Sequence, residues 1–340
     1  MTRGCLGGTL VAALLLLSGC SSPTAQRIVP GALTSGAAAP RSLGHRTPFT
    51  NLYVANVSSV TVYAPGSGKV LRKISDVQPT GIALDSSGNL YVSSDTGSGR
   101  VLVYPSGSTV SSRTIVQNVR KPRTLAVDPS NQLYVANGYF SIGVYAPGSS
   151  ALLRKLKSFF PISIAFDAAD NVYVGRSSGP YGGIESRVIV FAHDSAKTLR
   201  TITTDISDPQ SLAFDSSGDL CVADTNLNIV AVYPKGATKP QRKIKSGISG
   251  PAALGVDGSG NLYVANNVSS TVTVYPPGTT KPMRTITSGI SGPTALLLDS
   301  SGTLYVANRR MVTVYAPGSS SPKLRIRNGI DAPVALALGP

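Results

Sequence analysis

Short apolar segments alternate with polar turns along residues 50–340, and one Leu-Tyr-Val-like segment recurs. Its seven copies begin at Leu52, Leu90, Leu133, Val172, Leu220, Leu262 and Leu304. Their spacings are 38, 43, 39, 48, 42 and 42 residues. A repeat of this length, built from short strands, is typical of a four-stranded propeller blade. The sequence therefore predicts an all-β fold, a seven-bladed β-propeller of four-stranded blades.

Each repeat reads as four strands with defined ends. The first strand follows the pattern Pro-x-x-Ile/Leu-Ala-x-Asp, as in residues 79–85, and a turn such as Asp85 to Gly88 leads into the Leu-Tyr-Val strand. Where Gly is missing from this turn, Asn131 and Asp170 replace it, and both tolerate positive φ. The third strand ends in an aromatic residue: Tyr63, Tyr104, Tyr145, Phe191, Tyr233, Tyr275 and Tyr315. The fourth strand carries an arginine: Arg72, Arg113, Arg154, Arg200, Arg242, Arg284 and Arg325.

The phase of the repeat predicts how the ring closes. The first copy begins at its second strand, Leu52, and the last residues, from Pro333 to Leu338, have the pattern of a first strand. We expect this C-terminal strand to complete the N-terminal blade. First strands also alternate small residues, such as Gly81, with large ones, such as Ile82 and Leu84, so that one blade can fill the hollows of the next.

The first twenty residues predict export. Arg3 precedes an apolar run from Leu10 to Leu17, which is too short to span a bilayer as a helix and fits a signal peptide. The run ends in Leu17-Ser-Gly-Cys20, which resembles the lipobox of bacterial lipoproteins, whose cysteine receives diacylglycerol and becomes the first mature residue. We therefore expect residues 1–19 to be a signal peptide and Cys20 to be lipidated. The alternative is an ordinary signal peptide with an incidental cysteine.

Residues 20–49 are rich in Ser, Pro, Ala, Gly and Thr, without an apolar period, and predict a flexible linker. The domain prediction is thus signal peptide, linker, and a propeller over residues 50–340. The chain would be anchored to the cell membrane or outer membrane, facing the periplasm or the cell surface. By resemblance to the sorting of such lipoproteins, Ser21 in place of Asp favours the outer membrane.

Cysteine usage and charge narrow the expected chemistry. Cys5 leaves with the signal and Cys20 is lipidated, so Cys221 remains alone and no internal disulfide forms. Cys221 stands where other repeats have Tyr, which predicts a small buried residue. The net charge is +15. Nucleic acid is nevertheless a poor partner for an exported, anchored protein, and we expect none.

The repeats carry a family resemblance. Thr80 to Val92 (Thr-Gly-Ile-Ala-Leu-Asp-Ser-Ser-Gly-Asn-Leu-Tyr-Val) and Leu262 to Asn266 (Leu-Tyr-Val-Ala-Asn) resemble NHL and YVTN propeller repeats. They are also similar to repeats of the gluconolactonase/regucalcin and streptogramin lyase families. The resemblance covers nearly all of residues 50–340 and implies the fold, whereas these repeats serve enzymes and binding modules alike.

That resemblance also implies an alternative function, a metal-dependent hydrolase or lyase. Its enzymes hold a metal through carboxylate, Asn or His ligands near the channel. This chain has one Glu, Glu185, in a loop, and two His, of which His45 is in the linker and His193 follows a third strand. The ligand sets of those enzymes do not map onto these residues, so we predict no catalytic residue, no metal site and no cofactor. Metal analysis would decide between the two functions.

Two sets of repeated charges each allow two interpretations. The aspartates that begin the turns (Asp85, Asp128, Asp167, Asp215, Asp257 and Asp299) suggest a carboxylate ring, but turn capping explains them. The fourth-strand arginines would guard the outer edges of the blades. They would alternatively form a basic belt for anionic polymers or lipid headgroups.

Aromatic residues outside the repeat pattern predict a binding surface. Twelve of the fourteen tyrosines occupy repeat positions, and the exceptions are Tyr139 and Tyr181, in loops between second and third strands. Phe140 adjoins the first, and Phe159 and Phe160 connect the same two blades. Loops of both kinds emerge on one face of a propeller, where exposed aromatics mark partner sites. The alternative is that Phe159 and Phe160 pack under the long segment 176–187.

We therefore expect a monomeric, lipid-anchored binding or scaffold protein that engages a protein or an anionic envelope polymer through this face. A structural surface protein without a small ligand is a third possibility. The identity of the partner is not encoded in any motif found here.

Overall fold

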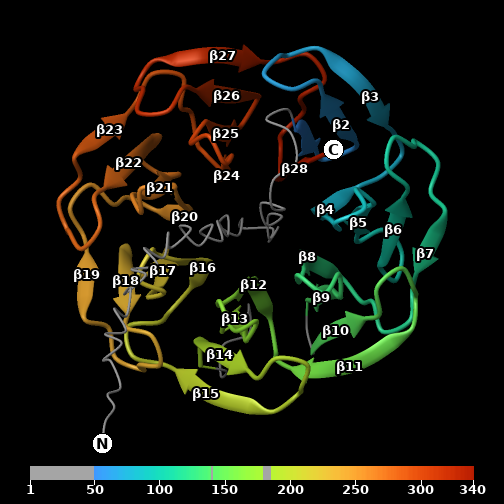
Figure 1. Ribbon diagram of the computed structural model, residues 1–340, viewed down its shortest axis with the longest axis horizontal. Helices are drawn as coiled ribbons and strands as arrows, with labels where there is room; N and C mark the ends of the chain where they lie inside the picture. Colours follow the sequence, from blue (N-terminus) through green and yellow to red (C-terminus); the bar gives the residue numbers. More distant parts are fainter. Residues whose placement is uncertain (1–49, 139–140, 179–184) are drawn as a thin grey trace, which may run out of the picture.

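The computed structural model describes residues 50–138, 141–178 and 185–340, which form a ring of seven four-stranded antiparallel sheets (Figure 1). The fold is therefore the predicted seven-bladed β-propeller, and the described residues contain no helix. The predicted signal peptide and linker, and Cys20, lie outside the described residues. Among the described residues no helix has the length and apolar character needed to cross a membrane.

The blades are numbered here in chain order. Blade 1 consists of β28 (Ala335–Gly339), β1 (Asn51–Ala55), β2 (Val60–Tyr63) and β3 (Val70–Ile74). Blade 2 consists of β4 (Pro79–Leu84), β5 (Leu90–Ser94), β6 (Arg100–Tyr104) and β7 (Arg113–Ile115). Blade 3 consists of β8 (Pro122–Val127), β9 (Leu133–Asn137), β10 (Ser141–Tyr145) and β11 (Leu152–Lys157). Blade 4 consists of β12 (Pro161–Phe166), β13 (Val172–Arg176), β14 (Arg187–Phe191) and β15 (Thr198–Ile202).

The last three blades follow the same order. Blade 5 consists of β16 (Pro209–Phe214), β17 (Leu220–Asp224), β18 (Ile229–Tyr233) and β19 (Arg242–Ile244). Blade 6 consists of β20 (Pro251–Val256), β21 (Leu262–Asn266), β22 (Thr271–Tyr275) and β23 (Arg284–Ile286). Blade 7 consists of β24 (Ala295–Leu298), β25 (Leu304–Asn308), β26 (Met311–Tyr315) and β27 (Pro322–Ile326).

The ring closes through β28, as the repeat phase predicts. β28 pairs antiparallel with β1, with Leu52 opposite Leu338 and Ala55 opposite Ala335. The backbone N–H of Val334 also donates to the carbonyl of Ala55 at 2.7 Å. The strand begins at Ala335, two residues later than the sequence pattern suggests. Three N-terminal strands and one C-terminal strand therefore complete blade 1.

The hydrophobic core lies between neighbouring blades. Each cluster of buried side chains joins adjacent blades, as where Tyr263 of β21 packs with Leu296 of β24. The small-to-large alternation explains this packing: a Cβ on Gly255 of β20 would lie 2.6 Å from Leu296 Cδ1 and 3.1 Å from Leu298 Cδ1. Large side chains of blade 7 thus occupy the hollow that a small residue leaves in blade 6.

The turns between first and second strands are capped by aspartate. Asp85 Oδ1 accepts hydrogen bonds from the N–H groups of Ser87 at 3.0 Å and Asn89 at 2.9 Å. Asn131 and Asp170, which replace the turn glycine, have φ of 62° and 64°. Both features confirm the turn-capping interpretation of these aspartates.

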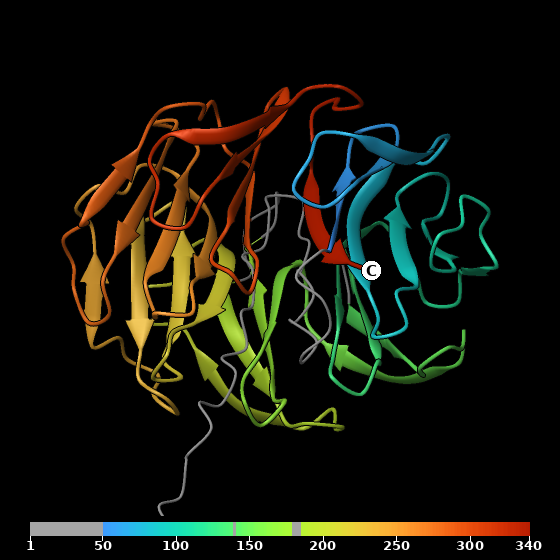
Figure 2. The same ribbon diagram turned by 45° about the horizontal axis from the view of Figure 1, so that its top comes forward.

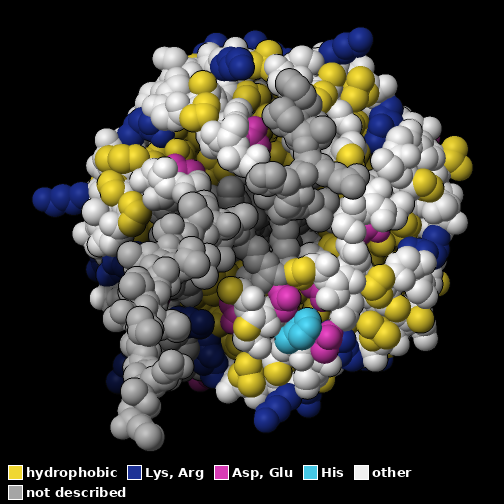
Figure 3. Space-filling model, viewed as in Figure 1, with side chains coloured by type: hydrophobic (Ala, Val, Ile, Leu, Met, Phe, Trp, Pro, Cys, Tyr) yellow, Lys and Arg dark blue, Asp and Glu magenta, His cyan; other side chains and the backbone are white. Residues whose placement is uncertain are grey.

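The propeller has two distinct faces (Figure 2). We use turn face for the side with the first-to-second and third-to-fourth strand turns, and loop face for the side with the second-to-third loops and the connections between blades. The first-to-second turns hold eight aspartates and no Lys or Arg: Asp85, Asp128, Asp167, Asp170, Asp215, Asp219, Asp257 and Asp299. Figure 3 looks onto the turn face, where acidic side chains appear around the central opening and beside the histidine.

Candidate functional site

The connections between blades on the loop face are held by a repeated asparagine. It ends the second strand and accepts a hydrogen bond from the connection that enters its own blade. Asn266 Oδ1 accepts from the N–H of Ser249 at 3.0 Å, and Asn308 Oδ1 accepts from the N–H of Ser291 at 2.8 Å. These asparagines are fully buried. The Asn belongs to the Leu-Tyr-Val-Ala-Asn motif, but the motif alone does not indicate this hydrogen bond.

A repeated tyrosine holds the same connections from the other side. It ends the third strand, and its hydroxyl donates to a carbonyl just after the preceding blade's fourth strand. Tyr275 donates to Ser246 O and Tyr315 to Ser288 O, each at 2.6 Å. The tyrosine at the end of the third strand therefore packs in the core and also holds the connection between blades.

Blade 4 departs from this pattern at both positions. Arg176 stands where five other blades have Asn or Asp and blade 2 has Ser94, and Phe191, which lacks a hydroxyl, stands in the tyrosine position. The connection into blade 4 is also the shortest of the ring and comprises only residues 158–160, whereas residues 245–250 connect β19 with β20. The loss of two tethers and the shorter connection occur together, so the loop face is rebuilt between blades 3 and 4.

Two of the predicted binding residues form this shortened connection. Phe159 and Phe160 are both half-buried, and Phe160 has φ of 46°, which is rare for a bulky side chain. The Phe160 carbonyl accepts from the N–H of Ser177 at 3.2 Å. Tyr139, Phe140 and Tyr181, the other members of the predicted cluster, lie outside the described residues. The predicted aromatic partner site therefore stays a prediction.

Arg176 is the prominent polar group of the rebuilt surface. Its guanidinium carbon lies 5.9 Å from the centroid of the Phe159 ring, within the range of a cation–π contact. Arg187 is directly opposite Arg176 in the register of β13 and β14. Burial lowers the pKa of Arg176, and the positive charge of Arg187 lowers it further. Arg187 donates from Nη2 to Glu185 Oε2 at 2.7 Å, with the Glu185 side chain 78% exposed. Sequence reasoning marked residues 176–187 only as an insertion and missed both arginines.

The fourth-strand arginines are half-buried and point inward. The Nη2 of Arg72 donates to the hydroxyl of Tyr53 at 2.9 Å, and the Nη2 of Arg154 donates to that of Tyr134 at 3.0 Å. In blade 5, where Cys221 replaces the tyrosine, Arg242 pairs directly with Asp215 at 3.3 Å. Structural ties thus explain these arginines more fully than edge protection alone.

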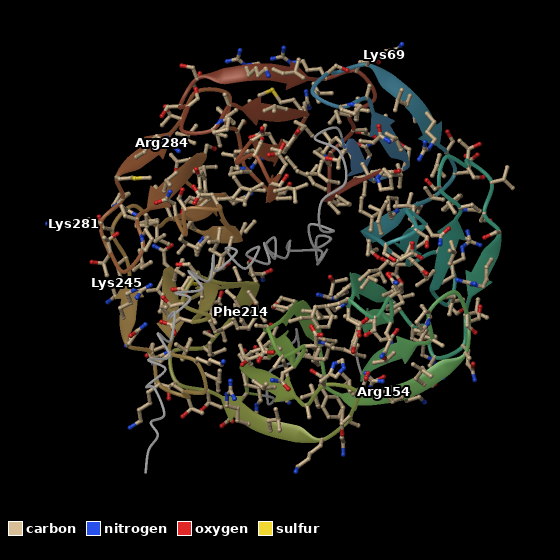
Figure 4. The ribbon with its side chains drawn as sticks, in the orientation of Figure 1. Lys69, Arg154, Phe214, Lys245, Lys281 and Arg284 are labelled. Carbon is tan, nitrogen blue, oxygen red and sulfur yellow. The ribbon has the colours of Figure 1, made fainter. Side chains whose placement is uncertain are left out.

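The seventh arginine of this set, Arg325, lies in a fourth strand as predicted but is not equivalent to the other six. Val314 of β26 pairs with Leu324, as Val62 of β2 pairs with Arg72, so Leu324 occupies the arginine position in blade 7. Arg325 is opposite Thr313 and therefore lies on the other side of the strand. Six arginines, rather than seven, are equivalent. Figure 4 shows two of them, Arg154 and Arg284, in contrast with Lys69 and Lys281, which extend away from the ring.

The turn face has its own irregularity in blade 4. Asp194, with φ of 51°, takes the place of the turn glycine that other blades have at positions such as Gly148. Its carboxylate accepts from Gln132 Nε2 at 2.6 Å and pairs with Arg154 at 3.3 Å, which ties blade 4 to blade 3. The Gln132 hydrogen bond, His193 and Arg154 lower the pKa of Asp194.

The remaining reactive groups give no catalytic constellation in the described ranges. Cys221 is fully buried as a free thiol, as predicted, and burial raises its pKa. Within residues 50–138, 141–178 and 185–340, no group of three or more His, Cys, Asp and Glu is arranged to hold a metal ion. A polar hollow of about 290 Å³ between blades 6 and 7 opens near Asp257, Arg284 and Ser301, away from the predicted site.

Comparisons with known proteins add no assignment: no protein-family model matches the chain, and no curated protein matches its sequence.

Proposed function

We propose that this chain is an extracytoplasmic, lipid-anchored binding or scaffold protein with propeller repeats of the NHL/YVTN type. It would be tethered through Cys20 to the cell membrane or outer membrane, and the linker would hold the propeller in the periplasm or at the cell surface. It would bind a protein or an envelope polymer through the loop face of blades 3 and 4.

The observation that supports this proposal most is the departure of blade 4 from the repeat. Asn or Asp and Tyr tether the connection into several other blades, whereas Arg176 and Phe191 replace both tethers at the shortest connection. Residues that abandon a stabilising pattern at one surface are typical of functional sites. The predicted aromatics Phe159 and Phe160 form the connection at that same place.

The anchor is tested with Cys20→Ala in the full chain. The wild-type protein is expected to incorporate a fatty-acid label and to sediment with membranes. Cys20→Ala should lose the label and leave the membrane fraction. Unchanged labelling and sedimentation of the variant would show that Cys20 is not the anchor.

Partner binding is tested by photo-crosslinking in cells, with a benzophenone amino acid at Phe160. Val268, which is 75% exposed on the loop face of blade 6, is the matched control position. We expect discrete adducts from position 160 and none from position 268. Equal yields at the two positions, or none at 160, would contradict a partner site between blades 3 and 4.

A further inference from the structure

The loop face of blades 3 and 4 carries a concentration of positive charge, which we call the basic sector. It consists of Arg120, Lys121, Arg123, Lys157, Arg176 and Arg187. Within the described residues of the connections that enter these two blades, of their second-to-third loops and of the adjoining strand ends, Glu185 is the single carboxylate, whereas Asp205 and Asp208 lie in the next connection, between β15 and β16. Four of the cations, Arg120, Lys121, Arg123 and Lys157, are exposed. The turn face of the same blades has the opposite sign, with Asp128, Asp167, Asp170 and Asp194.

The centre of the basic sector is a pair of like charges that folding alone does not require. Arg176 and Arg187 are opposite each other in the sheet, and like charges in that position destabilise a strand pair. The corresponding pairs in other blades are neutral or mixed, such as Asn266 with Thr271 and Asp224 with Ile229. The repulsion is therefore specific to blade 4.

Arg176 is also not committed to a structural partner as the fourth-strand arginines are. Arg72 and Arg154 donate to tyrosine hydroxyls, whereas no described residue accepts a hydrogen bond from the Arg176 side chain. Its guanidinium carbon lies 5.9 Å from the centroid of the Phe159 ring. Among the described residues, the side chain of Arg187 pairs with Glu185, whose exposed carboxylate gives a weak pair.

Two adjacent guanidinium groups suit a particular ligand chemistry. A guanidinium presents a planar set of donors that matches a carboxylate or phosphate with two parallel hydrogen bonds. The remaining cations extend the positive surface from β8 to β14 across two blades. A ligand that uses all of it must repeat its negative groups along its length, which a small anion does not do.

We infer that the basic sector binds a linear anionic polymer of the cell envelope through its repeated carboxylate or phosphate groups, with Arg176 and Arg187 as the central contacts. This inference rests on the proposed function, because it names the partner class of the same surface. The shared chemistry has two sources, acidic polysaccharides and phosphate polymers, and the experiment separates them.

The test uses residues 50–340, which contain every strand and the closing strand β28. Binding to fluorescent polygalacturonate, polyphosphate and neutral dextran is measured over a salt series. The variant is Arg176→Gln with Arg187→Gln. The matched control is Arg309→Gln with Arg310→Gln, which removes the same charge from two exposed arginines on the loop face of blade 7. Equal melting temperatures establish that both variants are folded.

We expect at least one anionic polymer to bind and dextran not to bind. The blade 4 variant should bind about tenfold more weakly, because two charge-assisted contacts are lost, and the control should stay within about twofold. Binding of polygalacturonate alone assigns carboxylates, and binding of polyphosphate alone assigns phosphates.

Two results would overturn the inference. Equal losses in both variants would show attraction by net charge without a site. Failure of the wild-type domain to bind either polymer would exclude this partner class, and it would leave the proposed function standing if Cys20 anchors the chain and position 160 captures a protein.

Discussion

Gly255 of β20 shows how a single residue position sets the spacing between blades. The methyl groups of Leu296 and Leu298 occupy the space that its missing side chain leaves. Gly258, three residues further on, has open space around it and no positive φ. Neither glycine has a positive φ, so the two positions differ in the space around them and not in a need for glycine's backbone freedom.

Gly255→Ala is expected to destabilise the propeller by about 1–3 kcal/mol, because the added methyl group forces blade 7 away from blade 6. Gly258→Ala should change stability by less than about 0.5 kcal/mol. Urea unfolding of both variants measures the difference. Equal free energies of unfolding would show that blade 7 adjusts without strain.

Individual residues also show what the sequence could predict and what it could not. The capping aspartates, Asn131 and Asp170 follow from local turn chemistry, which a pattern of neighbouring residues contains. Arg325 lies in the fourth strand, as predicted, but an arginine in a strand has two possible sides, and only the pairing with Thr313 decides between them. The role of Arg176 was missed because it replaces an Asn whose side chain accepts a hydrogen bond from the connection between blades, and that contact is not visible in the local sequence.

At the level of the element, β28 closes the ring by pairing with β1. Its residues Ala335, Leu336 and Ala337 are buried, and Leu338 is half-buried. The strand was predictable from the phase of the repeat. The rebuilt connection at residues 158–160 was not, since its meaning depends on the tethers that other blades retain.

Removal of residues 335–340 from the 50–340 domain is expected to abolish the cooperative thermal transition, because β1 loses its partner and two blade surfaces become exposed. Calorimetry compares the two lengths of chain. Leu336→Ala provides a milder change and should cost about 2–5 kcal/mol, with Leu338→Ala costing less. Retention of a full cooperative transition without β28 would mean that the ring does not depend on this strand.

At the scale of the molecule, the buried tyrosines make the stability of the fold depend on pH in alkaline solution. Burial raises the pKa of Tyr63, Tyr91 and Tyr315 from 10.0 to about 12. The folded state therefore keeps phenol protons that the unfolded chain releases above pH 10. The tyrosine contribution to stability is complete below pH 10 and is lost as the pH rises through about 12.

Alkaline titration tests this behaviour. The free energy of unfolding should be nearly constant just below pH 10 and should fall steadily above it, with tyrosinate absorbance rising late and together with unfolding. A set of tyrosines that ionises near pH 10 in the folded protein would show that their hydroxyls are not protected. The sequence predicted the positions of these tyrosines, but the hydrogen bonds of their hydroxyl groups required the three-dimensional arrangement.

The pairing of Leu52 with Leu338 also sets an order of events in time. Six blades are continuous in the chain and can each form from consecutive hairpins, whereas the blade that is begun first is finished last. A chain that emerges from its N-terminus keeps the edge of β1 unpaired until almost all of its residues have been delivered. A ring built in this way can close only when synthesis of the chain is nearly complete.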